Sequence, residues 1–286
     1  MRFFPSVIFE ITDKCNLNCV FCYEKYRRKN KDIDLEVFKK AIYKYKPLLI
    51  QLTGGEPTFH NNFNEILKYA LQKVLVVQFT TNGWNLEEKI PLIIKLKKKP
   101  IIAISLDFPS TLHNIIRKRN GLFEKIISNI KLLKKYKIPV ALSTTIFGSG
   151  IIKELPQGNL PFSSKLLKFA EDKKIAINFQ PTSPTTEKLR IALGKFLLNS
   201  NSKYIANTFA YRNLLINGHK GKCKYNLTNI SLNTNGEILP TFHNDCYFCN
   251  DCLKCYYSCV WEPSLLTSVQ GLSSANYYLK TYLSML

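Results

Sequence analysis

The segment VIFEITDKCNLNCVFCY, residues 7–23, joins an apolar run to a loop that holds three cysteines. Residues 7–11 have the alternating apolar pattern of a β-strand, and Cys15, Cys19 and Cys22 follow it with the spacing C-x3-C-x2-C. Closed zinc and iron–sulfur sites normally use four protein ligands. The spacing therefore predicts a metal centre at the end of a strand, with one coordination position left open.

Two simpler interpretations of these cysteines remain at this point. Cysteine is often just a small, buried hydrophobic residue. Three thiolates could also hold a zinc ion together with a histidine from elsewhere in the chain, such as His60 or His113.

The residues around the cysteines resemble the signature of the radical S-adenosylmethionine (radical SAM) enzymes, C-x3-C-x-aromatic-C, with Phe21 as the aromatic residue. A second element of that family, a Gly-Gly-Glu-Pro turn, occupies residues 54–57 after the next strand-like run. The resemblance implies that the thiolates hold three irons of a [4Fe-4S] cluster and that S-adenosylmethionine binds the fourth. It also implies reductive cleavage of that cofactor to a 5′-deoxyadenosyl radical, which abstracts hydrogen from a substrate.

By the same resemblance, the residues that bind S-adenosylmethionine lie at the ends of successive strands. The glycines of the turn would let a backbone carbonyl approach the methionine ammonium group, and Glu56 would add a negative charge near it. The candidates are Phe21, Tyr23, Gly54, Gly55, Glu56, Pro57, Asn82, Ser105, Asp107, Ser143 and Thr145. Taken singly, such residues are also ordinary turn formers and helix caps.

Strand-like runs alternate with amphipathic helical segments from residue 7 to about residue 180. The predicted strands are 7–11, 48–52, 74–80, 101–106, 140–145 and 175–179, and the predicted helices are 35–45, 63–71, 86–96, 122–136 and 165–173. This alternation is typical of a parallel α/β fold, but six units are too few for a closed eight-stranded barrel. We therefore predict a partial (βα)6 TIM barrel, which is also the fold that the resemblance implies.

The pattern changes after Pro181, and we expect four parts in the chain. They are the barrel (1–182), a helical connector (183–220) with helices at 187–198 and 203–216, a small cysteine-rich module (221–262) and a helical tail (263–286). Within the module, Asn235-Gly236 between two apolar runs predicts a β-hairpin.

Six further cysteines lie in this module: Cys223, Cys246, Cys249, Cys252, Cys255 and Cys259. The last four have the ferredoxin spacing C-x2-C-x2-C-x3-C. Read from Cys246, the spacing C-x2-C-x5-C-x3-C resembles the SPASM auxiliary-cluster module of radical SAM enzymes that modify peptides. This chain departs from that module, because Thr241 stands where the module has a cysteine and none follows Cys259. One auxiliary iron–sulfur cluster is the preferred interpretation, with two clusters or a structural zinc as alternatives.

Composition narrows the class of protein. The chain has 41 basic and 20 acidic residues, a formal net charge of +21, and either a solvated lysine-rich surface or a polyanion-binding surface would explain it. Nine cysteines in two clusters favour metal ligation in a reducing compartment over disulfides. No apolar run approaches the ~20 residues of a membrane span, so we expect a cytoplasmic protein with no membrane contact.

Together these observations predict a radical SAM enzyme that acts on a peptide or protein side chain. It would need a reducing partner such as ferredoxin or flavodoxin. Modification of RNA is the enzymatic alternative, and only the basic surface supports it. An iron–sulfur protein that transfers electrons or binds RNA without catalysis is a further alternative, which the intact Gly-Gly-Glu-Pro turn disfavours.

Overall fold

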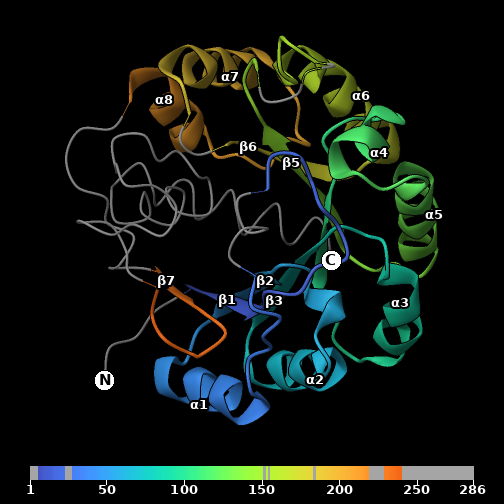
Figure 1. Cartoon of the computed structure of the whole chain (residues 1–286), viewed down its shortest axis with the longest axis vertical. Coiled ribbons are helices and arrows are strands. Elements are labelled where there is room, and N and C mark those ends of the chain that lie inside the picture. Colours follow the sequence, from blue (N-terminus) through green and yellow to red (C-terminus); the bar gives the residue numbers. More distant parts are fainter. Residues whose placement is uncertain are drawn as a thin grey trace. The chain divides into compact units, whose positions relative to one another are not determined.

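The computed structural model describes residues 6–22, 28–150, 153, 155–182, 185–218 and 229–239. Within them a seven-stranded sheet has the order β6-β5-β4-β3-β2-β1-β7 (Figure 1). Its strands are Ser6–Thr12 (β1), Leu49–Gly54 (β2), Val76–Thr81 (β3), Ile101–Ser105 (β4), Val140–Ile146 (β5), Ala176–Pro181 (β6) and Asn229–Leu232 (β7). The pairings from β7 through β4 are parallel. This order of strands is that of the predicted α/β fold.

The helices between the strands lie close to their predicted positions. Those of the predicted barrel are Leu35–Tyr45 (α1), Phe63–Lys73 (α2), Leu86–Lys95 (α3), Leu112–Arg117 (α4), Leu122–Lys135 (α5) and Ser163–Lys173 (α6), and those of the connector are Glu187–Asn199 (α7) and Phe209–Asn217 (α8). Of these, only the short helix α4 has no counterpart in the sequence prediction. By contacts within the chain, the protein divides into two compact units.

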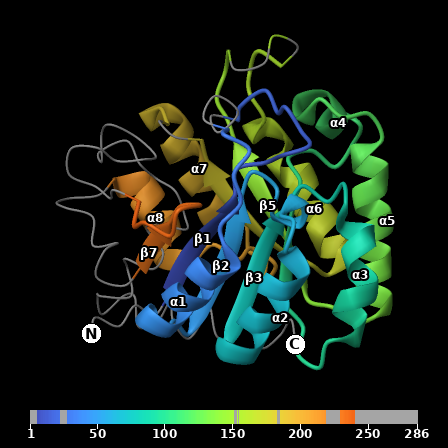
Figure 2. The ribbon, with the colours of Figure 1, turned by 60° about the horizontal axis from the view of Figure 1, so that its bottom comes forward.

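The first unit consists of Met1–Ser105, His113–Ala141 and Asn229–Leu239. Helices α1 and α2 lie side by side against β1, β2 and β3 (Figure 2). Helix α1 begins where the Asp34 side chain accepts hydrogen bonds from the next amides, and it ends at Lys46, which has the left-handed conformation. Its apolar stripe includes Phe38, whose ring meets Phe9 of β1 edge to face at 4.7 Å. Burial of each such ring contributes about 2 kcal/mol to folding.

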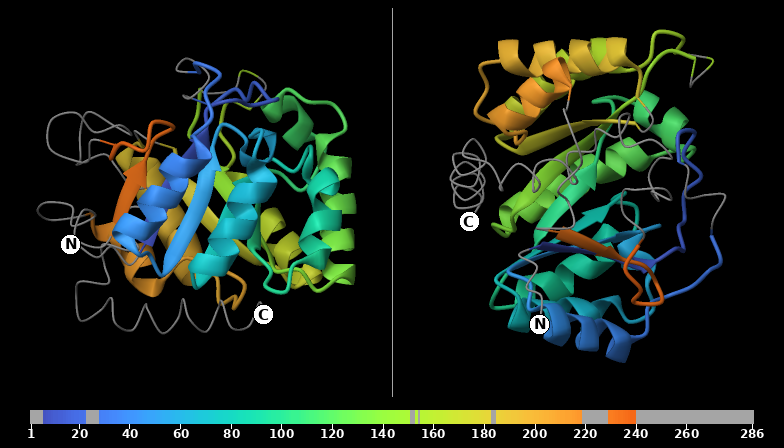
Figure 3. Two further views of the ribbon diagram at one scale, coloured as in Figure 1. Left: turned by 90° about the horizontal axis from the view of Figure 1, so that it is seen from below. Right: turned by 90° about the vertical axis from the view of Figure 1, so that its left-hand side faces the viewer.

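Strand β7 was not predicted as part of this sheet. It lies beside β1 (Figure 3). The two strands pair in parallel, from Ser6 opposite Asn229 to Phe9 opposite Leu232. Strand β7 is the first strand of the predicted hairpin, since its last residue Leu232 bridges Ile238 in antiparallel fashion and Gly236 in the turn has a φ of 75°. The hairpin was predicted within the cysteine-rich module, whereas its first strand extends the sheet that carries the N-terminal cysteine loop.

The second unit consists of Leu106–Leu112, Leu142–Thr228 and Pro240–Leu286. Helices α7 and α8 of this unit pack closely against each other. The Arg190 guanidinium of α7 also donates to the carbonyl of Ile216 in α8 at 3.0 Å. A helix was expected to start at residue 203, but α8 begins only after Thr208, whose hydroxyl accepts from the Tyr211 amide. Residues 204–206 instead pair alongside β6 through Ile177.

Across the part of the chain that the structure describes, no helix is both long and apolar enough to span a bilayer.

Candidate functional site

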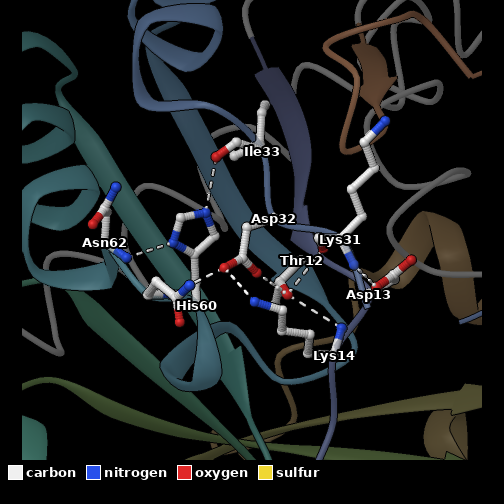
Figure 4. Close-up of polar contacts among 9 residues, drawn as sticks. Thr12, Asp13, Lys14, Lys31, Asp32, Ile33, His60 and Asn62 are labelled. Atoms are coloured by element: carbon white, nitrogen blue, oxygen red, sulfur yellow. Dashed lines mark hydrogen bonds and ion pairs between the residues drawn. The ribbon is translucent and has the colours of Figure 1, made fainter. Parts of the chain in front are cut away.

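The loop that leaves β1 carries the three cysteines, and its first residues are tied to a neighbouring segment. The hydroxyl of Thr12 donates to Asp32 at 2.6 Å, and the Lys14 ammonium forms an ion pair with the same carboxylate at 2.7 Å (Figure 4). Asp13 accepts hydrogen bonds from the amides of Lys29 and Lys31. These contacts fix the path of the chain as it enters Cys15.

The Gly-Gly-Glu-Pro turn lies directly against this loop. The Gly55 amide donates to the Thr12 carbonyl at 2.7 Å, and the Glu56 amide donates to the Lys14 carbonyl at 2.8 Å. Gly54 has a φ of 132°, and a Cβ on either glycine would fall well inside van der Waals contact with the backbone of the cysteine loop. These residues are therefore glycines because two backbones approach each other there.

Glu56 is buried and organises the ends of β2 and β3. One carboxylate oxygen accepts from the amide and hydroxyl of Thr58 and from the hydroxyl of Thr81 at 2.7 Å, and the other accepts from the Asn82 amide at 2.7 Å. Burial raises the pKa of Glu56, although these hydrogen bonds oppose the shift. Its neighbour Pro57 starts a short 3-10 helix, Pro57–Phe59 (η2), which the Glu56 side chain caps.

Three asparagines join the cysteine loop to the end of β3. The side-chain amide of Asn82 donates to the side-chain oxygen Oδ1 of Asn16 at 2.8 Å and lies 4.0 Å from the Cys15 sulfur. The side-chain amide of Asn16 in turn donates to the side-chain oxygen of Asn85 at 2.9 Å. The structure thus brings the predicted residues Cys15, Glu56 and Asn82 together in one unit. Ser105, at the end of β4, belongs to the same unit.

Cys19 has a neighbour that the sequence analysis missed. The Arg117 guanidinium lies 3.9 Å from the Cys19 sulfur, and its central carbon lies 5.1 Å from the centroid of the Phe21 ring. The Val20 amide donates to the Ile116 carbonyl at 2.9 Å, which fixes this part of the loop against α4. No sequence motif links Arg117 to the cysteines, because the contact exists only in the folded chain.

The three cysteines of this loop form no disulfide and differ in exposure. Cys19 is buried, whereas Cys15 and Cys22 are partly accessible. Burial raises the pKa of the Cys15 thiol to about 11, although a hydrogen bond from the Leu17 amide opposes the shift. Within the described residues, no three His, Cys, Asp or Glu side chains converge on the position of a single metal ion. A cubane cluster requires a different arrangement, because each thiolate then binds a different iron.

His60 is engaged elsewhere. Its Nε2 atom lies 3.0 Å from the Ile33 carbonyl oxygen, which can only accept, so Nε2 carries the proton (Figure 4). Its Nδ1 atom accepts from the Asn62 amide at 2.9 Å. Both ring nitrogens are thus used within the fold, which argues against His60 as a zinc ligand beside the cysteines.

This arrangement predicts a pH dependence of stability in the metal-free protein. Burial lowers the pKa of His60, and it lowers that of His113 further, from an ordinary value of 6.5. The unfolded chain therefore binds protons more readily than the folded one. The free energy of unfolding should be fully developed above pH 6.5 and should decrease as the pH falls below it, by up to about 1.4 kcal/mol per unit for each histidine.

Urea unfolding between about pH 5 and pH 7.5 measures this slope. His60→Gln should remove the share of His60 and leave that of His113. A slope that is unchanged in His60→Gln would contradict the assignment.

A separate group of predicted residues lies in the second unit. Asp107 is fully buried, and its carboxylate accepts from the Thr145 amide at 2.9 Å. Ser143 and Thr145 are partly exposed and lie on the same face of β5, because they are two residues apart in a strand. Tyr23 and the six C-terminal cysteines lie outside the described residues.

Comparison with known proteins defines the class. Residues 9–157, about half of the chain, match the model of the radical SAM superfamily. The antilisterial bacteriocin subtilosin biosynthesis protein AlbA of Bacillus subtilis is 37% identical over 145 residues, which are 49% of this chain and 32% of that protein. The sporulation killing factor maturation protein SkfB of the same organism is 29% identical over 146 residues, 49% of this chain and 35% of that protein.

Among solved structures, SuiB of Streptococcus suis bound to S-adenosylmethionine is similar in fold. Its TM-score is 0.62 at 16% identity, and the match covers 89% of this chain and 66% of SuiB. The chain spans about a third of the length of the two Bacillus relatives. The chain belongs to the radical SAM superfamily, a family of enzymes, and it has that family's partial-barrel fold.

Proposed function

We propose that this protein is a radical SAM enzyme in which Cys15, Cys19 and Cys22 hold a [4Fe-4S] cluster with one open iron. The observation that carries the proposal is the placement of the cysteine loop. Its backbone lies against Gly54 and Gly55, and N–H donors of two other side chains lie near its sulfurs. Such donors suit thiolates that carry negative charge.

When bound, the cluster and S-adenosylmethionine supply one-electron chemistry that yields a 5′-deoxyadenosyl radical. The chain itself orients the groups around them. The Glu56 carboxylate accepts from the backbone amide of Asn82 and so holds this residue in place. The Asn82 side chain then reaches both Asn16 and the Cys15 sulfur. We propose that Phe21, Tyr23, Pro57, Ser105, Asp107, Ser143 and Thr145 contribute to cofactor binding as the family resemblance implies.

We further propose that the substrate is a peptide or protein side chain. Two relatives are named for bacteriocin biosynthesis and for maturation of a killing factor, and SuiB has been solved with its precursor peptide SuiA. The C-terminal cysteines would hold one auxiliary iron–sulfur cluster. The electron would come from a partner such as ferredoxin or flavodoxin in the cytoplasm.

The deciding experiment is anaerobic reconstitution with iron and sulfide, followed by iron analysis of the wild type and of a variant with Cys15, Cys19 and Cys22 all replaced by alanine. The wild type should bind about four more irons than this variant. After addition of dithionite and S-adenosylmethionine, only the wild type should release 5′-deoxyadenosine. Equal iron contents and no 5′-deoxyadenosine from the wild type would refute the proposal.

A matched control is the replacement of Cys246, Cys249, Cys255 and Cys259 by alanine, which should remove the auxiliary iron. The wild type and this variant should both give an electron paramagnetic resonance (EPR) signal that changes when S-adenosylmethionine is added. If the S-adenosylmethionine-responsive signal were lost from this variant and kept in the triple variant, the open iron would belong to the C-terminal cysteines. That result would contradict the proposal.

A further inference from the structure

Arg117 is a buried cation at the cysteine loop. The residue is 8% exposed, and its terminal nitrogen Nη1 approaches the Cys19 sulfur at 3.9 Å. The guanidinium also lies over the Phe21 ring, at 5.1 Å from its centroid. Phe21 is two residues from Cys19, so the same loop contacts the guanidinium through a ring and a sulfur atom. The contact from Val20 to Ile116 holds the two backbones together beside it.

The chemistry of this contact differs from that at Cys15. There the donor is the neutral amide of Asn82, at 4.0 Å from the sulfur. A guanidinium is protonated at every accessible pH, so Arg117 brings a full positive charge. Because Arg117 is shielded from water, its interaction with a nearby charge is stronger than it would be at the surface.

We propose that Arg117 sets the reduction potential of the cluster held by Cys15, Cys19 and Cys22. This inference rests on the proposed function. Reduction adds one electron, taken from the partner protein, and therefore one negative charge to the cluster and its thiolates. Arg117 stays protonated throughout, and no proton moves. The cation stabilises the reduced state more than the oxidised state and makes the cluster easier to reduce.

The known determinants of iron–sulfur potentials support this direction. Net charge, hydrogen bonds to sulfur and exposure to solvent all affect the potential. Arg117 acts on the first two at a ligand that is itself buried. Arg117 is a positioning residue in this proposal, because it acts through Cys19 and not on the substrate.

The alternative is that Arg117 only packs against the loop. The conservative variant separates the two roles, since Arg117→Lys keeps the charge and loses the planar fork, whereas Arg117→Met keeps an apolar stem and loses the charge. Arg119→Met is the matched control. Arg119 is two residues away and stacks on Trp84, with its guanidinium carbon 3.8 Å from the ring centroid.

The measurement is an anaerobic redox titration of the reconstituted full chain, followed by EPR. The signal that changes on addition of S-adenosylmethionine identifies the cluster with the open iron. Arg117→Met should lower the equilibrium constant for its one-electron reduction about tenfold, which equals about 59 mV. Arg117→Lys should fall between that value and the wild type, and Arg119→Met should match the wild type within about twofold.

Several outcomes would overturn the inference. One is a wild-type potential in an Arg117→Met variant with full iron content, and another is an equal shift in Arg119→Met. If Arg117→Met and Arg117→Lys both lose the cluster, Arg117 serves assembly and the proposal on the potential is rejected. A wild type without an S-adenosylmethionine-responsive signal would instead refute the proposed function on which the inference depends.

Discussion

Replacing Gly54 with alanine should destabilise the first unit by more than about 4 kcal/mol and prevent assembly of the cluster. Two effects combine at this position. The backbone has a φ of 132°, which residues with a Cβ rarely adopt, and the new Cβ would overlap the carbonyl oxygen of Thr12. That oxygen belongs to backbone and already accepts from the Gly55 amide, so it cannot move without disturbing the cysteine loop. Urea unfolding and iron content after reconstitution measure the two consequences.

Two other glycines separate these effects. Gly121 has a φ of 76° with no atom near its missing Cβ, so Gly121→Ala measures backbone strain alone, expected at about 1 kcal/mol. Gly55 does not have a positive φ, but a Cβ there would overlap the Lys14 carbonyl oxygen. Gly55→Ala should therefore resemble Gly54→Ala and not Gly121→Ala. Similar stabilities for all three variants would show that the loop and the turn are not in close contact.

Replacing Glu56 with glutamine should destabilise the protein by about 3 kcal/mol, although the side chains have nearly the same shape. Every contact described for this carboxylate is with a donor, on Thr58, Thr81 and Asn82. An amide nitrogen in place of one oxygen would face a donor without water to relieve the conflict. We also expect weaker retention of iron, because the Asn82 side chain would lose its orientation toward Cys15. Denaturant unfolding and iron analysis test both effects.

Glu237 provides the matched control for this change. It is exposed, and its carboxylate accepts from the Asn233 and Asn235 side chains in the turn after β7. Glu237→Gln should leave stability and iron content almost unchanged. If Glu56→Gln behaved in the same way, the carboxylate of Glu56 would have no organising role.

Sequence patterns predicted the helices correctly where neighbouring residues alone determine the conformation. Helix α1 was predicted with its observed bounds from its amphipathic pattern. In the structure the Asp34 side chain caps it. The predicted start of α8, at residue 203, was wrong, since the helix begins at Phe209. The segment before Thr208 has a helix-like composition, but pairing with Ile177 of β6 holds it extended. Tertiary contacts outweighed local preference there.

The sequence predicted which residues form the site better than it predicted the contacts that these residues make. The cysteine spacing and the Gly-Gly-Glu-Pro turn identified the loop and its neighbour. From the sequence, the glycines were expected to make room for a cofactor, whereas in the structure the backbone of the cysteine loop itself lies against them. Arg117 lies almost 100 residues after Cys19 in the chain, so only the folded structure could reveal its contact with that cysteine.

The parallel pairing of β7 with β1 affects the order of events during synthesis. The paired residues of the two strands, such as Ser6 and Asn229, are 223 positions apart in sequence, yet β1 leads directly into the cysteine loop. Such a distant contact closes late and slowly. While a ribosome is still making the central part of the chain, β1 lacks this flank, and a nascent chain halted before residue 229 would expose one edge of the strand. The sheet around β1, which leads into the cysteine loop, would therefore be completed only after β7 has been synthesised.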